Sequence, residues 1–217
     1  MKRLPEIKSF QRLRIFGTDR SLQRLGIEAI DLYLLHNPSL ENLKSEDSFE
    51  VIESFVDQSK IKHWGVSVNT LEECEYSVAS GKPAVMQMEY NILEQEPEAV
   101  FAKAHAAGIG VIARVPLKRG MLSGRFNEQT AFESTDLRGR ILSADKMPEL
   151  VDKVKQIEAA SASVGRPLAE IAMRFCISNP HVAVTIPGIR TPKQARSNAV
   201  ACEPLPAEVV EVLRQLA

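Results

Sequence analysis

The sequence predicts an α/β protein in which about five parallel strands alternate with helices. Short apolar runs recur along the chain, and longer segments with helical periodicity separate them. The short runs are apolar at consecutive positions, as expected of parallel strands that are buried on both faces. We therefore expect successive strand–helix units that share one sheet.

The elements follow one another with clear start and stop signals. Thr70 and Glu73 form a capping box that begins a helix running to about Ala79. Gly108 ends another helix immediately before a strand. The predicted strands are residues 29–35, 61–68, 84–90, 109–115 and 182–186, and the other predicted helices are residues 97–107, 148–164, 167–178 and 206–216. Residues 1–20 are expected to form a basic, partly helical lead-in.

The composition is typical of a globular domain that has no general affinity for nucleic acid or membranes. With 217 residues, 44% of them hydrophobic, the chain can form one sizeable core, and we expect residues 1–217 to be a single domain. A formal net charge of -1 gives no general attraction to nucleic acid or to anionic membranes. Cys74, Cys176 and Cys202 lack the spacing of a disulfide framework or a metal site, which favours a cytoplasmic location.

Polar residues gather where the predicted strands end. Those ends are residues 36–38, 67–69, 87–91, 114–124 and 187–198. In parallel α/β sheets, the loops after the strands build the functional site. The candidate residues are therefore expected in these five segments.

The same segments carry a resemblance to a known family. Residues 21–36 are SLQRLGIEAIDLYLLH, residues 65–67 are GVS and residues 87–91 are QMEYN. Residues 116–124 are PLKRGMLSG, and residues 186–188 are IPG. In this order, at successive strand ends, the motifs resemble those of aldo-keto reductases, nicotinamide-dependent oxidoreductases built on a (β/α)8 TIM barrel.

The resemblance runs from about Ser21 to the C-terminus and implies an incomplete (β/α)8 barrel of about five parallel βα units, with the N-terminal strands missing. A typical complete barrel takes ~250 residues. Either the remaining strands are supplied elsewhere, or the fold is a rearranged open sheet. An open set of strands leaves two unpaired edges, so we expect self-association or a need for the missing segment.

His36 directly follows a buried strand, where an imidazole can polarise a substrate carbonyl. The resemblance implies that it is the catalytic histidine. On the residues alone, a polar side chain satisfied at the edge of the core is the alternative.

The resemblance also implies a site for NADP(H). Ser67 and Gln87 correspond to the pair that binds the nicotinamide carboxamide. The family usually has an asparagine directly after this serine, whereas here Val68 follows Ser67 and Asn69 comes next. Asn69 is implied as the substitute for that asparagine, and its alternative role is to flank the Thr70 cap. Arg114 has two alternative roles: its planar guanidinium can stack on the nicotinamide ring, or it can form a structural ion pair at the strand end. The other implied cofactor residues are Pro116, Leu117, Gly120, Leu122 and Gly124 in a glycine-containing loop, and Pro187, Gly188, Arg190, Lys193, Gln194 and Asn198 after the last strand. A loop with two glycines lets backbone N–H groups approach a pyrophosphate closely, and the neighbouring Lys118 and Arg119 favour an anion there. An ordinary turn is the alternative.

The segment after the last strand predicts an anion site on physical grounds. Thr191 is a helix N-cap followed by a proline, and a helix N-terminus carries partial positive charge. The resemblance implies that Arg190 and Lys193 recognise the 2′-phosphate of NADP, and that Gln194 and Asn198 contact adenine. A solvated helix start is the alternative.

The family's proton donor is a Tyr supported by Lys and Asp, all from the first strands, and none of Tyr33, Tyr76 and Tyr90 can be assigned to that role. The expected function is therefore an NADP-dependent oxidoreductase that transfers hydride between NADPH and an aldehyde or ketone, truncated and weakly active or inactive as this chain. The alternative is a non-catalytic NADP-binding or interaction module. The expected partner is a small carbonyl substrate, with no nucleic acid, membrane or metal.

Overall fold

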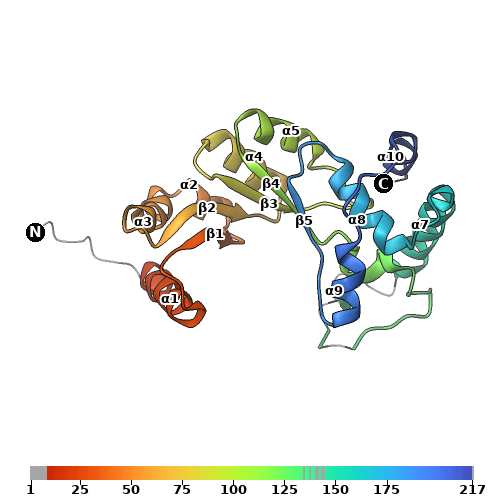
Figure 1. The fold of residues 1–217 in the computed structure, drawn as a ribbon, viewed down its shortest axis with the longest axis horizontal. Helices are drawn as coiled ribbons and strands as arrows, with labels where there is room; N and C mark the ends of the chain where they lie inside the picture. Colours follow the sequence, from red (N-terminus) through yellow and green to blue (C-terminus); the bar gives the residue numbers. More distant parts are fainter. Residues whose placement is uncertain (1–8, 134, 137, 140–141, 143–144, 217) are drawn as a thin grey trace, which may run out of the picture. The chain divides into compact units, whose positions relative to one another are not determined.

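The computed structural model describes residues 9–133, 135–136, 138–139, 142 and 145–216, without the side chains of residues 9–16 and 46–48. Figure 1 labels the elements along the ribbon. In chain order they are α1 (Ser9–Leu25), β1 (Ile30–His36), α2 (Leu40–Lys44), α3 (Glu46–Asp57), β2 (Ile61–Ser67), α4 (Leu71–Ser80), β3 (Val85–Glu89), α5 (Glu98–Ala106), β4 (Gly110–Arg114), the 3-10 helix η1 (Lys118–Ser123), α7 (Met147–Ala160), the 3-10 helix η2 (Ala162–Val164), α8 (Leu168–Ser178), β5 (Val184–Ile186), α9 (Pro192–Ala199) and α10 (Ala207–Arg214).

The strands follow the order of the chain in one sheet, β1-β2-β3-β4-β5. Parallel pairing joins β1 to β2, β2 to β3, and β4 to β5. Helices lie between successive strands along the chain. The predicted α/β class with about five parallel strands is confirmed. The predicted lead-in lies partly in α1, and its residues 1–8 fall outside the described part.

The chain divides into two compact units, and each is described separately below. The first comprises residues up to Gln87 together with Ala106–Ile109, and the second comprises Met88–His105 and the residues from Gly110 onward. Neither unit is a continuous segment. The chain leaves the first unit after Gln87, returns to it for Ala106–Ile109 and then continues in the second unit.

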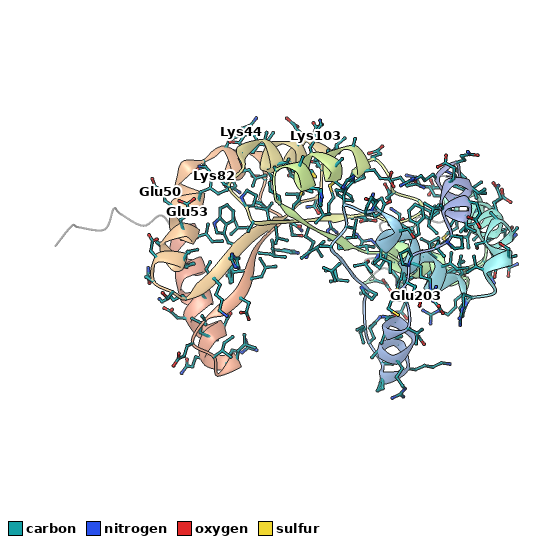
Figure 2. All side chains as sticks on the ribbon, turned by 45° about the horizontal axis from the view of Figure 1, so that its top comes forward. Lys44, Glu50, Glu53, Lys82, Lys103 and Glu203 are labelled. Carbon is teal, nitrogen blue, oxygen red and sulfur yellow. The ribbon has the colours of Figure 1, made fainter. Side chains whose placement is uncertain are left out.

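In the first unit, α3 packs on β2 through aromatic contact. The rings of Phe49 and Trp64 lie 5.3 Å apart between centroids, and Nζ of Lys82 lies 4.6 Å from the centroid of the Phe49 ring. Figure 2 shows Lys82 on the ribbon of this unit. Phe49 and Trp64 are 3% and 6% exposed, so this contact is part of the core. A buried aromatic pair of this kind stabilises the helix on the sheet.

Gly65 lets the three strands of the first unit approach closely. It pairs with Leu34 of β1 and with Val85 of β3. A Cβ atom at this position would lie 2.2 Å from the carbonyl oxygen of Val85 and 2.8 Å from Cδ2 of Leu34. No side chain fits there without moving the backbone of β3.

The second unit is centred on the buried ring of Tyr90. This ring packs against Phe101 at 5.3 Å and Phe175 at 5.7 Å between centroids. Its hydroxyl donates a hydrogen bond to Glu98, which also forms an ion pair with Arg214 at 3.4 Å. The network ties Tyr90, the residue after β3, to α5, α8 and the C-terminal helix α10.

All three cysteine thiols are free, and two of them are buried. Burial raises the pKa of Cys74 and of Cys176 to about 12, so both thiols stay protonated near neutral pH. Cys74 Sγ lies 2.9 Å from Met86 Sδ, which places it in the core of the first unit. None of the helices in the described ranges is long and apolar enough to cross a membrane.

Candidate functional site

Three predicted site residues form one row across the first unit. His36 of β1 is the register partner of Ser67 in β2, and Ser67 is the partner of Gln87 in β3. Partners in parallel register project to the same face of a sheet because side chains alternate along each strand. Residues separated by up to 51 positions in the sequence are thus brought together at the carboxyl ends of three neighbouring strands.

The two members of the carboxamide pair are already hydrogen bonded to each other. Ser67 Oγ lies 3.0 Å from Gln87 Oε1 and donates to it. Ser67 is 3% exposed, so its hydroxyl is fixed in the interior. With its oxygen engaged, the Gln87 amide is oriented, and its NH2 group can act as a donor. This arrangement suits recognition of a planar carboxamide group.

His36 lies at the exposed end of the row. The residue after it, Asn37, has a φ of +49°, and its backbone N–H donates to the Ser67 carbonyl at 2.8 Å. Asparagine tolerates this left-handed conformation better than most residues. The turn at Asn37 therefore ends β1 sharply and leaves the imidazole accessible.

Asn69 belongs to the start of helix α4. Its backbone N–H and that of Thr70 both donate to Glu73 Oε2, at 2.9 and 3.1 Å. Thr70 Oγ1 in turn accepts from the Glu73 N–H, which completes the predicted capping box. The flanking role for Asn69 is thus present in the structure, and a cofactor role remains a prediction.

The loop after β4, residues 115–124, has an unusual backbone. Val115, Lys118 and Arg119 have φ values of +57°, +41° and +54°, although none of them is glycine. Gly120 and Gly124 have φ values of +101° and +69°. Each non-glycine residue in the left-handed region costs roughly 1–3 kcal/mol, and a β-branched residue such as Val115 is a clear outlier. Strain of this kind is found most often at functional sites.

The other residues predicted for this loop differ in how far they are exposed to solvent. Pro116 and Leu122 are buried. Pro116 has no backbone N–H, and the N–H of Leu122 donates to the Leu117 carbonyl at 3.2 Å. Leu117 and Gly120 are half-buried, and Gly124 is exposed with its αL backbone ending η1. The N–H of Gly120 donates to the Leu117 carbonyl at 2.8 Å.

Two carboxylates reach the same loop from elsewhere in the second unit. Glu89 of β3 lies 3.1 Å from Lys118 Nζ, 3.7 Å from Arg119 Nη2 and 3.9 Å from Arg114 Nη1. Glu94 also accepts a hydrogen bond from Lys118. Sequence reasoning missed both carboxylates, because they lie outside the loop. Arg114 is thus in an ion pair, one of the two roles left open for it, and burial is the main cause that lowers its pKa.

Helix α9 begins as predicted, with a capping box of its own. Thr191 Oγ1 accepts from the Gln194 N–H at 3.2 Å, and Gln194 Oε1 accepts from the backbone N–H groups of Arg190 and Thr191 at 2.7 and 3.1 Å. The Gln194 oxygen is therefore engaged, and its adenine contact remains a prediction. Arg190 and Lys193 are exposed at this helix start. The nearby Asp136 carboxylate feels the charge of Arg190, a minor cause of its low pKa beside the larger effect of Arg138.

Asn198, one turn further along α9, lines a pocket of about 240 Å3 with Pro187, Thr185, Val184 and residues of α8. Its Nδ2 atom is buried and has no hydrogen-bond partner within the described part of the chain. A buried amide without a partner is unfavourable, and a ligand acceptor would relieve it. Gly188, which precedes α9 in the chain, is exposed.

The tyrosines offer no evident proton donor. Burial, followed by the hydrogen bond to Glu98, raises the pKa of Tyr90 well above its usual range. Tyr90 is thus a core residue of the second unit. Tyr76 lies on α4, and Tyr33 lies three residues before His36 on β1, which directs it to the opposite face. The parts of the chain that the structure describes contain no cluster of three or more ligating side chains that could hold a metal ion.

Residues 17–217 match the model of the aldo/keto reductase family. The chain is 30% identical over 180 residues to the aldo-keto reductase YhdN of Bacillus subtilis, covering 81% of this chain and 54% of that protein. It is 26% identical over 231 residues to a putative voltage-gated potassium channel subunit beta of Schizosaccharomyces pombe, covering 99% of this chain and 66% of that protein.

Among solved structures, an aldo-keto reductase from Bacillus halodurans in its holo form has 25% identity and a TM-score of 0.76, covering 95% of this chain and 67% of the other. The curated relatives are longer proteins, and this chain spans 54% to 66% of the two named above. The five strand–helix units correspond to part of a (β/α)8 barrel. On the family match over residues 17–217, the chain belongs to the aldo/keto reductase family.

Proposed function

We propose that the protein binds NADP(H) and acts in hydride transfer between that cofactor and an aldehyde or ketone. The observation that carries the proposal is the row formed by His36, Ser67 and Gln87, with its hydrogen bond of 3.0 Å between Ser67 and Gln87. The cofactor supplies the hydride when bound. In this reading, His36 is the catalytic residue that polarises the substrate carbonyl.

Ser67 and Gln87 would bind the carboxamide of the nicotinamide. Ser67 fixes the Gln87 amide, and the oriented amide can donate to the carboxamide oxygen. Orientation of the ring decides which face gives up the hydride, so a fixed amide contributes through positioning.

Residues at and after the start of α9 would bind the 2′-phosphate and the adenine. The exposed side chains of Arg190 and Lys193 suit a 2′-phosphate at the start of α9. The buried Nδ2 of Asn198 is a donor that lacks a partner within the described residues, and a ring nitrogen of adenine can accept from it. The pocket of about 240 Å3 that Asn198 lines offers room beside it. These features fit NADP(H) and favour it over NAD(H).

We further propose that these 217 residues alone reduce carbonyls weakly or not at all. General acid catalysis contributes ~10²–10⁴-fold, and the Tyr90 hydroxyl is engaged in the core. The same observation favours a second candidate function, the binding of NADP(H) by a module that does not itself catalyse reduction. Both functions require cofactor binding, and only the first requires turnover.

The substitution Gln87→Leu tests the proposal. NADPH binding can be followed by the change in its fluorescence, with Gln58→Leu as a control, because Gln58 is an exposed residue at the end of α3. We expect Gln87→Leu to weaken NADPH binding about tenfold, the effect of one lost hydrogen bond to a buried group. If both variants bind NADPH as tightly as the wild type, Gln87 does not contribute to cofactor binding, and the proposal is contradicted.

A further inference from the structure

Glu89 is the point at which three cations of the second unit converge. Its Oε1 lies 3.1 Å from Lys118 Nζ, and its Oε2 lies 3.7 Å from Arg119 Nη2 and 3.9 Å from Arg114 Nη1. The Glu89 side chain is only 20% exposed, and that of Lys118 is 13% exposed. Water screens the attraction between opposite charges less where the side chains are this buried.

Two of these cations belong to the most unusual part of the loop backbone. Lys118 and Arg119 are consecutive non-glycine residues with φ values of +41° and +54°. Such a conformation persists only where the surrounding structure holds it. The side chains of both residues end on the same carboxylate, that of Glu89 on the neighbouring strand β3.

Glu94 provides a natural comparison within the same cluster. It contacts Lys118, and its side chain is 42% exposed. Glu89 and Glu94 therefore bring the same charge close to the same loop. Of the two, Glu89 contacts both residues of the strained pair.

We propose that Glu89 is a positioning residue, which holds the loop of residues 115–124 in the conformation that receives the pyrophosphate of the dinucleotide. This inference rests on the proposed function. It makes a prediction opposite to that of simple electrostatics. A carboxylate beside an anion site repels the anion, so its removal should strengthen binding if charge alone matters. If Glu89 positions the loop, its removal weakens binding.

The experiment compares Glu89→Gln with Glu94→Gln, which remove the same charge. Each variant is titrated with NADPH and with adenosine 2′-phosphate, which lacks the pyrophosphate and tests the α9 end alone. We expect Glu89→Gln to weaken NADPH binding about tenfold, as for the loss of roughly one charge-assisted hydrogen bond, and to leave adenosine 2′-phosphate binding unchanged. Glu94→Gln should bind NADPH as well as or better than the wild type.

Two titration results would overturn the inference. Tighter NADPH binding in both variants would show that Glu89 acts through its charge alone. A parallel loss of both ligands in Glu89→Gln would show a general structural role. Restoration of NADPH affinity in Glu89→Asp, which keeps the carboxylate, would support positioning.

Limited trypsin digestion gives a readout that needs no cofactor, because trypsin cleaves after Lys118 and Arg119. We expect faster cleavage at these two residues in Glu89→Gln and unchanged cleavage in Glu94→Gln. Equal cleavage in the wild type and Glu89→Gln would overturn the role of Glu89 in holding the loop. If the wild type binds no NADPH, the proposed function fails, whereas a wild type that binds NADPH beside an unaffected Glu89→Gln variant refutes this inference alone.

Discussion

Tyr90 illustrates how far a single residue can be interpreted from sequence. It lies next to the predicted site at the end of β3, and the motif around it carries part of the family resemblance. Its ring nevertheless faces the core, and its hydroxyl contacts Glu98 and lies 3.5 Å from Asn179 Nδ2. The direction of a side chain after the last paired residue of a strand depends on packing with helices distant in sequence. The sequence alone therefore leaves its role open.

The substitution Tyr90→Phe distinguishes a core residue from a proton donor. Loss of the buried hydroxyl leaves Glu98 with one fewer hydrogen bond, which should lower the free energy of unfolding by about 1–2 kcal/mol. We expect NADPH binding, and any residual carbonyl reduction, to stay unchanged. Denaturant unfolding and a reductase assay measure the two effects. A selective loss of reduction at unchanged stability would show that Tyr90 is the missing acid.

The elements of this chain were largely predictable, because their signals are local. Capping boxes at Thr70 and Thr191 mark the starts of α4 and α9. The strained loop was less predictable. Its positive φ values at Val115 and Lys118 carry no glycine signal. The Lys118 side chain pairs with Glu89, which lies on a different strand. Ion pairs between side chains far apart in the sequence depend on the tertiary structure, and the hydrophobic periodicity of the sequence does not predict them.

The close approach of β1, β2 and β3 gives a prediction for one element. Gly65→Ala would place a Cβ atom 2.2 Å from the Val85 carbonyl oxygen, so β2 and β3 would have to separate. We expect a loss of roughly 3 kcal/mol in the free energy of unfolding, measured by denaturant titration. Gly17→Ala is the control, because no atom of the described part of the chain lies within 4 Å of a Cβ atom built there. In the interior of α1, that change should stabilise by roughly 0.5–1 kcal/mol. Equal stability of the two variants would contradict the packing described for Gly65.

At the scale of the whole molecule, β1 and β5 stand at the two ends of the strand order. On β5, Val184 and Ile186 are 45% and 43% exposed, an uncommon state for apolar residues of a parallel strand. Exposed apolar edge strands promote association. We therefore expect the chain to self-associate in sedimentation experiments.

The double substitution Val184→Lys with Ile186→Lys should shift the protein toward monomer, because charge on an edge strand opposes pairing. Val212→Lys is the control, since Val212 is 46% exposed but lies on helix α10. A monomeric wild type with cooperative unfolding would show that the exposed strand does not drive association.

The central claim is that the chain binds NADP(H) through the start of α9, and calorimetric titration with NADPH and NADH tests it most directly. Contacts to a 2′-phosphate are worth ~1.5–3 kcal/mol each, so we expect saturable binding of NADPH at least about tenfold tighter than that of NADH. Arg190→Ala should abolish this preference, and Lys103→Ala, which changes an exposed cation of α5, should preserve it. Equal affinities for the two cofactors, or saturable binding of neither, would contradict the account.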